Sequence, residues 1–152
     1  MNLSANFTLE EMVKSQTALR CDIDNTPSEE HIAAMRALAA HVLQPVREHF
    51  GKPVRISSGY RCVDLCTAVG SKPTSQHAKG EAADFEIPGV GNPVVAAYIR
   101  DNLVFDQLIL EFYDPDEGPN SGWVHCSYVE PKDNRNMCLT INKSGTKQGL
   151  LA

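Results

Sequence analysis

The sequence predicts an α+β fold in which N-terminal helices pack on a mainly antiparallel sheet. Helical patterns, marked by capping residues and by apolar positions three or four apart, occur mainly in the first half of the chain. Short strand-like runs separated by turn-rich segments cluster later. No linker rich in glycine, serine or proline divides the 152 residues, so we expect a single domain over residues 1–152.

Three segments have the features of helix starts. Residues 8–11 form a capping box, residues 26–29 combine a capping hydroxyl with proline and an acid, and residues 92–93 are Asn-Pro. In the second segment we expect Thr26 to cap the helix. Its apolar positions recur at helical spacing: Ile32, Met35, Leu38, Ala39, Val42 and Val46. Pro45 is expected to kink or end this helix before Gly51.

Five runs are predicted as strands: residues 54–57, 82–87, 105–112, 123–129 and 137–141. Alternation along the second run places Phe85 and Ile87 on one face and Asp84 on the other. Because Phe85 and Ile87 belong in the core, we expect Asp84 to face a cleft. Residues 114–122 are rich in turn formers and predict a loop between two strands, long enough to form one wall of a site.

The composition argues against several classes of partner. The net charge is −5 and lysine and arginine are spread along the chain, so we expect no nucleic acid partner. No apolar run approaches the roughly 20 residues of a membrane helix, so we expect no membrane insertion. The first six residues lack the basic start and apolar core of a secretory signal. We therefore expect synthesis in the cytoplasm without a signal peptide.

The cysteines do not form a recognisable framework. They are odd in number and include no Cys-x-x-Cys pair, which argues against both a disulfide scaffold and a thiolate zinc site. We interpret them as small buried or half-buried thiols. Cys62 and Cys66 are four residues apart and could share a helical face, and whether they pair stays open.

Residues 75–85 carry the most informative pattern. His77 and Asp84 are seven residues apart. On one helix their Cα atoms would lie about 10 Å apart, and on one straight strand their side chains would point to opposite faces. A turn between them allows both to approach one ion, and Gly80 is placed to make that turn.

Two later strands supply further candidates. His125 shares a strand face with Trp123 and Ser127, although a histidine in an apolar strand is by itself more often a core residue than a ligand. Glu111 ends a strand among large apolar residues, where a carboxylate at the rim is the simpler interpretation in isolation. Together with His77 and Asp84 they complete the set that a catalytic zinc needs: three protein ligands, an open position for water, and a base.

These patterns occur together in a known family. The chain resembles the zinc D-Ala-D-Ala carboxypeptidase and L-alanyl-D-glutamate endopeptidase family, peptidase family M15, and looks most similar to its phage and prophage branch. The matching motifs run in the family's order through residues 6–11, 25–27, 57–61, 75–84, 105–111 and 123–127. Ser-x-His-x-x-Gly-x-Ala-x-Asp followed by Trp-Val-His is a specific combination. The resemblance implies the Hedgehog/DD-peptidase fold.

The resemblance also implies roles for individual residues. The implied zinc ligands are His77, Asp84 and His125. Arg61 is implied to reach the substrate and the charge that develops on it, since a guanidinium suits either a terminal carboxylate or an oxyanion. Ser75, Trp123 and Tyr60 are further expected substrate contacts.

Two departures from the family pattern matter. Many members place the catalytic acid three residues before the last histidine, where this chain has Gly122. We assign the role of base to Glu111, with three loop acids as alternatives: Asp114, Asp116 and Glu117. Cys62 and Cys66 stand where a serine and an asparagine are expected, which affects local substrate contacts and not the metal.

The sequence therefore predicts a monomeric zinc metallopeptidase, a hydrolase that cleaves an amide bond in peptidoglycan stem peptides. Carboxypeptidase and endopeptidase activity both stay open, because loop shape decides between them. We expect action on the cell wall after delivery or lysis, as for a phage endolysin. Alternatives are a weakly active or inactive zinc-binding virion or wall component, a non-heme iron oxygenase, and an α+β domain with coincidental motifs. The oxygenase is disfavoured because such enzymes usually use His-x-Asp.

Overall fold

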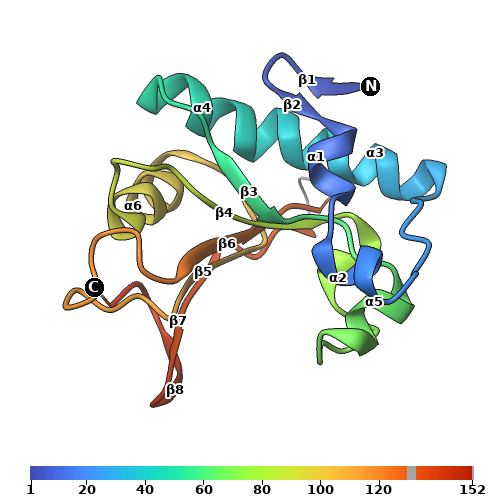
Figure 1. Cartoon of the computed structure of the whole chain (residues 1–152). Coiled ribbons are helices and arrows are strands. Elements are labelled where there is room, and N and C mark those ends of the chain that lie inside the picture. Colours follow the sequence, from blue (N-terminus) through green and yellow to red (C-terminus); the bar gives the residue numbers. More distant parts are fainter. Residues whose placement is uncertain (130–132, 152) are drawn as a thin grey trace.

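Within residues 1–129 and 133–151, which the computed structural model describes, six strands form one sheet. They are β3 (Arg55–Ser58), β4 (Ala82–Glu86), β5 (Gln107–Glu111), β6 (Trp123–Ser127), β7 (Met137–Asn142) and β8 (Gly145–Gln148). Their order is β3-β4-β6-β5-β7-β8, and every neighbouring pair is antiparallel except β5 and β7 (Figure 1). The predicted α+β class with a mainly antiparallel sheet is confirmed.

Most of the helices pack against one face of this sheet. The helices are α1 (Leu9–Val13), α2 (Gln16–Arg20), α3 (Glu29–Leu38), α4 (Gln44–Phe50), α5 (Val63–Ala68) and α6 (Asn92–Asn102), with a π-helical turn η1 (Ala39–Leu43) and a 3-10 turn η2 (Gln76–Lys79). A small ribbon of β1 (Asn2–Ser4) and β2 (Phe7–Thr8) precedes them. Figure 1 shows α3 and α4 along one side of the sheet, with α2 and α5 together at one end. None of the described helices combines the length and apolar character needed to cross a membrane.

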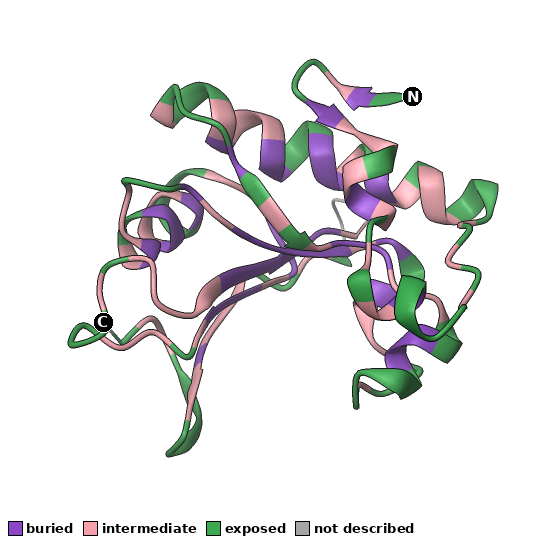
Figure 2. Cartoon of the chain, in the orientation of Figure 1, coloured by how far each residue is buried: buried purple, intermediate pink, exposed green. Residues whose placement is uncertain are grey.

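One face of the sheet and the helices form the core. Met35 and Val46 from the helical segment, Ile99 from α6, and Phe85 and Val124 from the strands are all fully buried in one cluster. Figure 2 shows the buried residues gathered on the central strands and on the helix faces turned toward them. Because successive strand residues alternate, the opposite face of β4, β6 and β5 is left to carry polar side chains.

The long helix starts later than predicted. Ser28 caps it: its hydroxyl accepts a hydrogen bond from the His31 backbone N–H, and His31 Nδ1 accepts one from the Ser28 backbone N–H. The prediction that Thr26 is the cap is wrong, because its hydroxyl bonds to the Asp24 carboxylate at 2.5 Å instead. Pro27 therefore precedes the helix.

Pro45 does not end the helix. The chain passes from α3 through the π-helical turn into α4, and the Gln44 backbone N–H reaches back to the Ala39 carbonyl. This wider turn places Pro45 in the first turn of α4, where a missing N–H is tolerated. The helix ends before Gly51, as expected, and Gly51 takes the left-handed conformation (φ 64°).

Several short elements were not predicted, and some predicted strands are shorter. The extra elements are β1, β2, α2, α5 and β8. The strand predicted at residues 105–112 begins at Gln107 and ends at Glu111, because Phe112 has a positive φ of 54°. The cysteines are free. The prediction of buried or half-buried thiols is wrong for Cys21, which is exposed, and is confirmed for the other four.

Candidate metal centre

Three predicted residues converge on one point of the polar sheet face. His77, Asp84 and His125 are buried, and one potential ligand atom from each lies within 4.8 Å of the others. Asp84 Oδ1 is 2.9 Å from His125 Nδ1 and 3.4 Å from His77 Nε2. The two imidazole rings lie 5.1 Å apart at their centroids. Side chains that are well separated along the sequence thus meet within one small volume.

Sheet register brings Asp84 and His125 together. They are direct partners on the antiparallel strands β4 and β6. Directly opposed residues on one sheet face have Cβ atoms about 4.5–5.5 Å apart, which suits two side chains sharing one ion. The expected outward orientation of Asp84, with Phe85 in the core, agrees with this pairing.

A tight turn brings His77 to the same point. His77 lies in η2, which ends at Gly80 with φ 76°. A Cβ on Gly80 would lie 2.5 Å from the His31 carbonyl oxygen, so both the backbone angle and the space favour glycine. The turn predicted at Gly80 is therefore present, and the Ser75 hydroxyl supports it by accepting a hydrogen bond from the His77 backbone N–H.

The hydrogen bonds of His77 orient its free nitrogen toward the cluster. Nδ1 lies 2.7 Å from the Gly59 carbonyl oxygen, which can only accept, so Nδ1 carries the proton and donates. Nε2 faces the Asp84 carboxylate, 3.4 Å from its Oδ1, on the side of the ring where an ion would lie. A carbonyl behind the ring is the usual support for a metal-binding histidine.

The carboxylate of Asp84 is held in its charged form. Burial by itself would raise its pKa, but hydrogen bonds and charge interactions with His125 and His77 outweigh burial and lower the pKa well below its ordinary value. Two imidazole nitrogens and one anionic oxygen form a donor set that zinc accepts. The residues present thus fit a divalent metal ion.

A cavity of about 290 Å³ opens over this cluster. It is lined by Arg61, Ser71, Ser75, His77, Asp84, Glu111, Trp123 and His125. The predicted site residues therefore share this cavity, with one exception. Tyr60 lies in the hydrophobic core, where its ring packs 4.8 Å from the His31 ring and its backbone N–H donates to the Met12 carbonyl. Ser71 was not predicted, because it belongs to no motif.

Glu111 is the acidic residue in this cavity besides Asp84. Burial raises its pKa, as does the negative charge of Asp84, while His125, Trp123 and Arg61 act in the opposite direction. None of the three loop acids that were alternatives for the base lines this cavity; Asp114 and Glu117 line a different one.

The position of the missing family acid is closed to side chains. Gly122 has φ 65°, and a Cβ there would overlap the Glu111 carbonyl oxygen and the Phe112 backbone. The backbone of Gly122 therefore packs where an acid would begin. A side chain at residue 122 would therefore require the backbone of Glu111 and Phe112 to shift.

Arg61 is joined to the loop that carries His77. Its backbone N–H donates to the His77 carbonyl at 3.1 Å. Its guanidinium Nε is buried and has no hydrogen-bond partner among the described residues. A buried cationic donor on a cavity wall is suited to an anionic group of a bound molecule.

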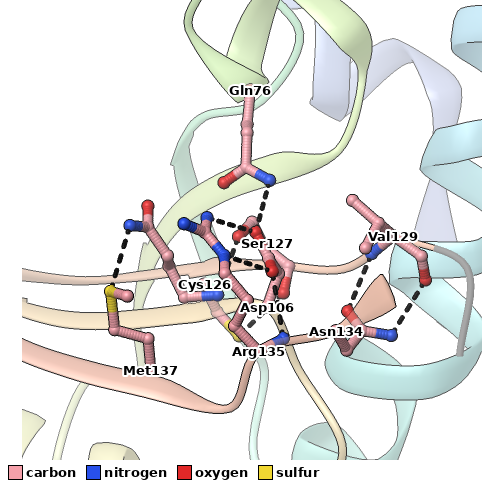
Figure 3. Close-up of polar contacts among 9 residues, drawn as sticks. Gln76, Asp106, Cys126, Ser127, Val129, Asn134, Arg135 and Met137 are labelled. Carbon is pink, nitrogen blue, oxygen red and sulfur yellow. Dashed lines mark hydrogen bonds and ion pairs between the residues drawn. The ribbon is translucent and has the colours of Figure 1, made fainter. Parts of the chain in front are cut away.

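A polar cluster that was not predicted supports the same loop (Figure 3). Asp106 accepts hydrogen bonds from Gln76 Nε2 at 2.8 Å and from the Arg135 guanidinium at 2.7 and 2.9 Å. These bonds, above all those from Arg135, lower the pKa of Asp106 despite its burial. Because Gln76 precedes His77, Asp106 links this loop to the start of β5.

Comparison with known proteins identifies the family. No curated protein matches the chain at a meaningful level. A family model described as Peptidase M15 matches residues 5–127, a span that contains all the residues around the cluster. The resemblance inferred from the motifs is therefore confirmed at the level of the family. The chain belongs to the Peptidase M15 family, whose members are metallopeptidases.

Proposed function

We propose that this protein is a zinc peptidase that hydrolyses an amide bond in peptidoglycan stem peptides. The observation that carries the proposal is the convergence of His77, Asp84 and His125 in one cavity that also contains Glu111 and Arg61. Membership of a metallopeptidase family supports peptide hydrolysis. An imidazole and carboxylate donor set supports zinc as the ion.

Each residue has a defined task in this proposal. His77, Asp84 and His125 would hold the ion. The ion would lower the pKa of a bound water and act as a Lewis acid. Glu111 accepts the proton of the attacking water and returns it to the leaving amine. Arg61 binds the negative charge that develops on the substrate oxygen, or a substrate carboxylate.

Ser75 and Trp123 line the same cavity and contact the peptide in this proposal. We keep D,D-carboxypeptidase and L,D-endopeptidase activity as its two forms, which differ in the bond that is cut. We further propose that the protein acts as a monomer on the cell wall after delivery or lysis, as a phage or prophage endolysin does.

The proposal is tested by digestion of purified peptidoglycan with zinc-loaded protein. We expect new free amino groups, and mass spectrometry of the released muropeptides identifies the bond. Glu111→Gln protein with the same zinc content is the control and should release far less. If the zinc-loaded wild type binds walls but releases no peptide product, the alternative of a non-catalytic zinc-binding wall component replaces the proposal.

A further inference from the structure

A second, larger cavity adjoins the metal cavity. Its volume is about 540 Å³, within the range of roughly 300–1,000 Å³ that is common for ligand pockets. Arg61 lines both cavities and so lies between them. The walls are formed by Lys14, Ser15, Gln16, Thr17, Arg55, Ile56, Ser57, Ser58, Arg61 and Val69. We call this space the cationic cavity.

The charged side chains that line the cationic cavity are all basic. Lys14, Arg55 and Arg61 line it, and none of its described lining residues is acidic. Lys14 makes no side-chain hydrogen bond or ion pair with any described residue. Arg55 pairs with Glu86 at 3.1 Å, but its side chain is 67% exposed, so it stays available to a second anion. In a chain of net charge −5, this concentration of positive charge is a local exception.

The wall of the cationic cavity is attached to the metal cluster. The Ser57 hydroxyl donates to the Asp84 backbone carbonyl at 3.2 Å, and Ser58 is the register partner of Asp84 across β3 and β4. Lys14, which also lines the cavity, lies in the connection between α1 and α2. A peptide held at the metal cluster can therefore extend past Arg61 and reach Lys14 and Arg55.

We propose that the cationic cavity binds a carboxylate of the peptide substrate and selects anionic peptides. The placement of this carboxylate beside the cut bond rests on the proposed function. In a stem peptide the carboxylate has two possible sources, the C-terminus and the side chain of an acidic residue. A terminal carboxylate makes the cavity the closed end of a carboxypeptidase site, whereas an internal one makes it part of an endopeptidase groove.

The test measures peptide binding by titration calorimetry to zinc-loaded Glu111→Gln protein, in which turnover does not interfere. The probes are L-alanyl-γ-D-glutamyl-L-lysyl-D-alanyl-D-alanine and two derivatives, one amidated at the C-terminus and one amidated at the glutamyl carboxylate. We expect one amidation to weaken binding about three- to fivefold, as for a partly exposed ion pair. The derivative that binds more weakly identifies the source.

Variants assign this preference to the cavity. In the same Glu111→Gln protein, Lys14→Ala and Arg55→Ala should each weaken binding of the parent peptide about threefold. Each should also reduce the difference in affinity between the parent peptide and the amidated derivative that binds more weakly. Lys147→Ala is the matched control, because it removes the same charge from β8 at the opposite edge of the sheet. The Lys147→Ala variant should bind all three peptides with the same affinities as the Glu111→Gln protein that carries no further substitution.

Equal binding of the three peptides, unchanged binding by the Lys14 and Arg55 variants, or no measurable binding of the parent peptide would each overturn the inference. These outcomes do not decide whether the protein is a peptidase. If charge-dependent binding occurs but the wild type cleaves no peptidoglycan, the cationic cavity stands and the peptidase proposal fails. If the wild type cleaves peptidoglycan and neither Lys14 nor Arg55 contributes to binding, the peptidase proposal stands and the inference about the cationic cavity fails.

Discussion

Asp84 and His125 are direct register partners on neighbouring antiparallel strands, and Asp84 Oδ1 lies 2.9 Å from His125 Nδ1. Their contact is therefore a property of how β4 pairs with β6. A slip of one residue would turn one of the two side chains into the helix-covered core face. The metal cluster thus depends on the correct pairing of the central strands, with only His77 supplied by a separate turn.

Removal of one imidazole should release the metal. We expect His77→Ala to weaken zinc binding by more than about 100-fold, because even changes to groups that only support a ligand weaken binding by about 10–100-fold. Zinc per chain after dialysis against a weak chelator measures this. His49→Ala is the control. His49 is exposed, its ring stacks on the Tyr98 ring, and it does not line the metal cavity. If His77→Ala retains zinc as the control does, His77 is not a ligand.

Replacement of the proposed base should separate turnover from metal content. Glu111→Gln keeps the shape of the side chain but accepts no proton, so kcat should fall about 10²- to 10⁴-fold while zinc content stays near that of the wild type. Glu117→Gln is a suitable comparison, because Glu117 lies in the loop outside the metal cavity. Wild-type turnover by Glu111→Gln would transfer the role to one of the loop acids.

The core and the orientation of the site could be predicted because they follow from local alternation. A period of two along residues 82–87 was enough to place Phe85 inside and Asp84 outside, and the structure agrees. The seven-residue spacing between His77 and Asp84 likewise required a turn, which Gly80 provides. Such features depend on neighbours in the sequence and on the dimensions of regular structure.

What could not be predicted depends on contacts between distant segments. Gln76, Asp106 and Arg135 meet across separations of 29 and 30 residues, and no motif joins them. Tyr60 follows the motif residues Ser58 and Gly59, yet tertiary packing buries its ring in the core. The helix start was misplaced for a local reason, since both Thr26 and Ser28 can cap. Ser28 exchanges hydrogen bonds with His31, whereas the Thr26 hydroxyl bonds to Asp24.

The close approach of Gly122 to Glu111 predicts a strong sensitivity to side chains at residue 122. Gly122→Ala should destabilise the protein by at least about 2 kcal/mol, because a positive φ and overlap with the Glu111 carbonyl act together. Gly118→Ala, in the same loop, also has a positive φ but open space around the new Cβ, so its effect should be smaller. Urea unfolding of the two variants measures the difference. Equal stability would mean that the loop shifts freely away from β5.

The buried carboxylate of Asp106 predicts a specific dependence of stability on pH. Hydrogen bonds from Arg135 and Gln76 lower its pKa in the folded protein, so the charged form is favoured by folding. Its contribution is complete above the unfolded pKa of about 3.9 and is lost as the pH falls through the lower folded pKa. Asp106→Asn should therefore lower the free energy of unfolding by about 1.5–3 kcal/mol at pH 7, with a smaller difference from wild type below about pH 4.

Urea unfolding of both proteins between pH 3 and pH 7 gives these free energies. Asp101→Asn is the matched control, because Asp101 also pairs with an arginine, but both side chains are exposed and little change is expected. The same variants report on the metal cluster, since Asp106 holds Gln76 beside His77. Asp106→Asn should weaken zinc binding as well as folding, whereas Asp101→Asn should leave both as they are. A loss of stability in Asp106→Asn that persists unchanged at pH 3 would show that its effect comes from packing and not from the charge.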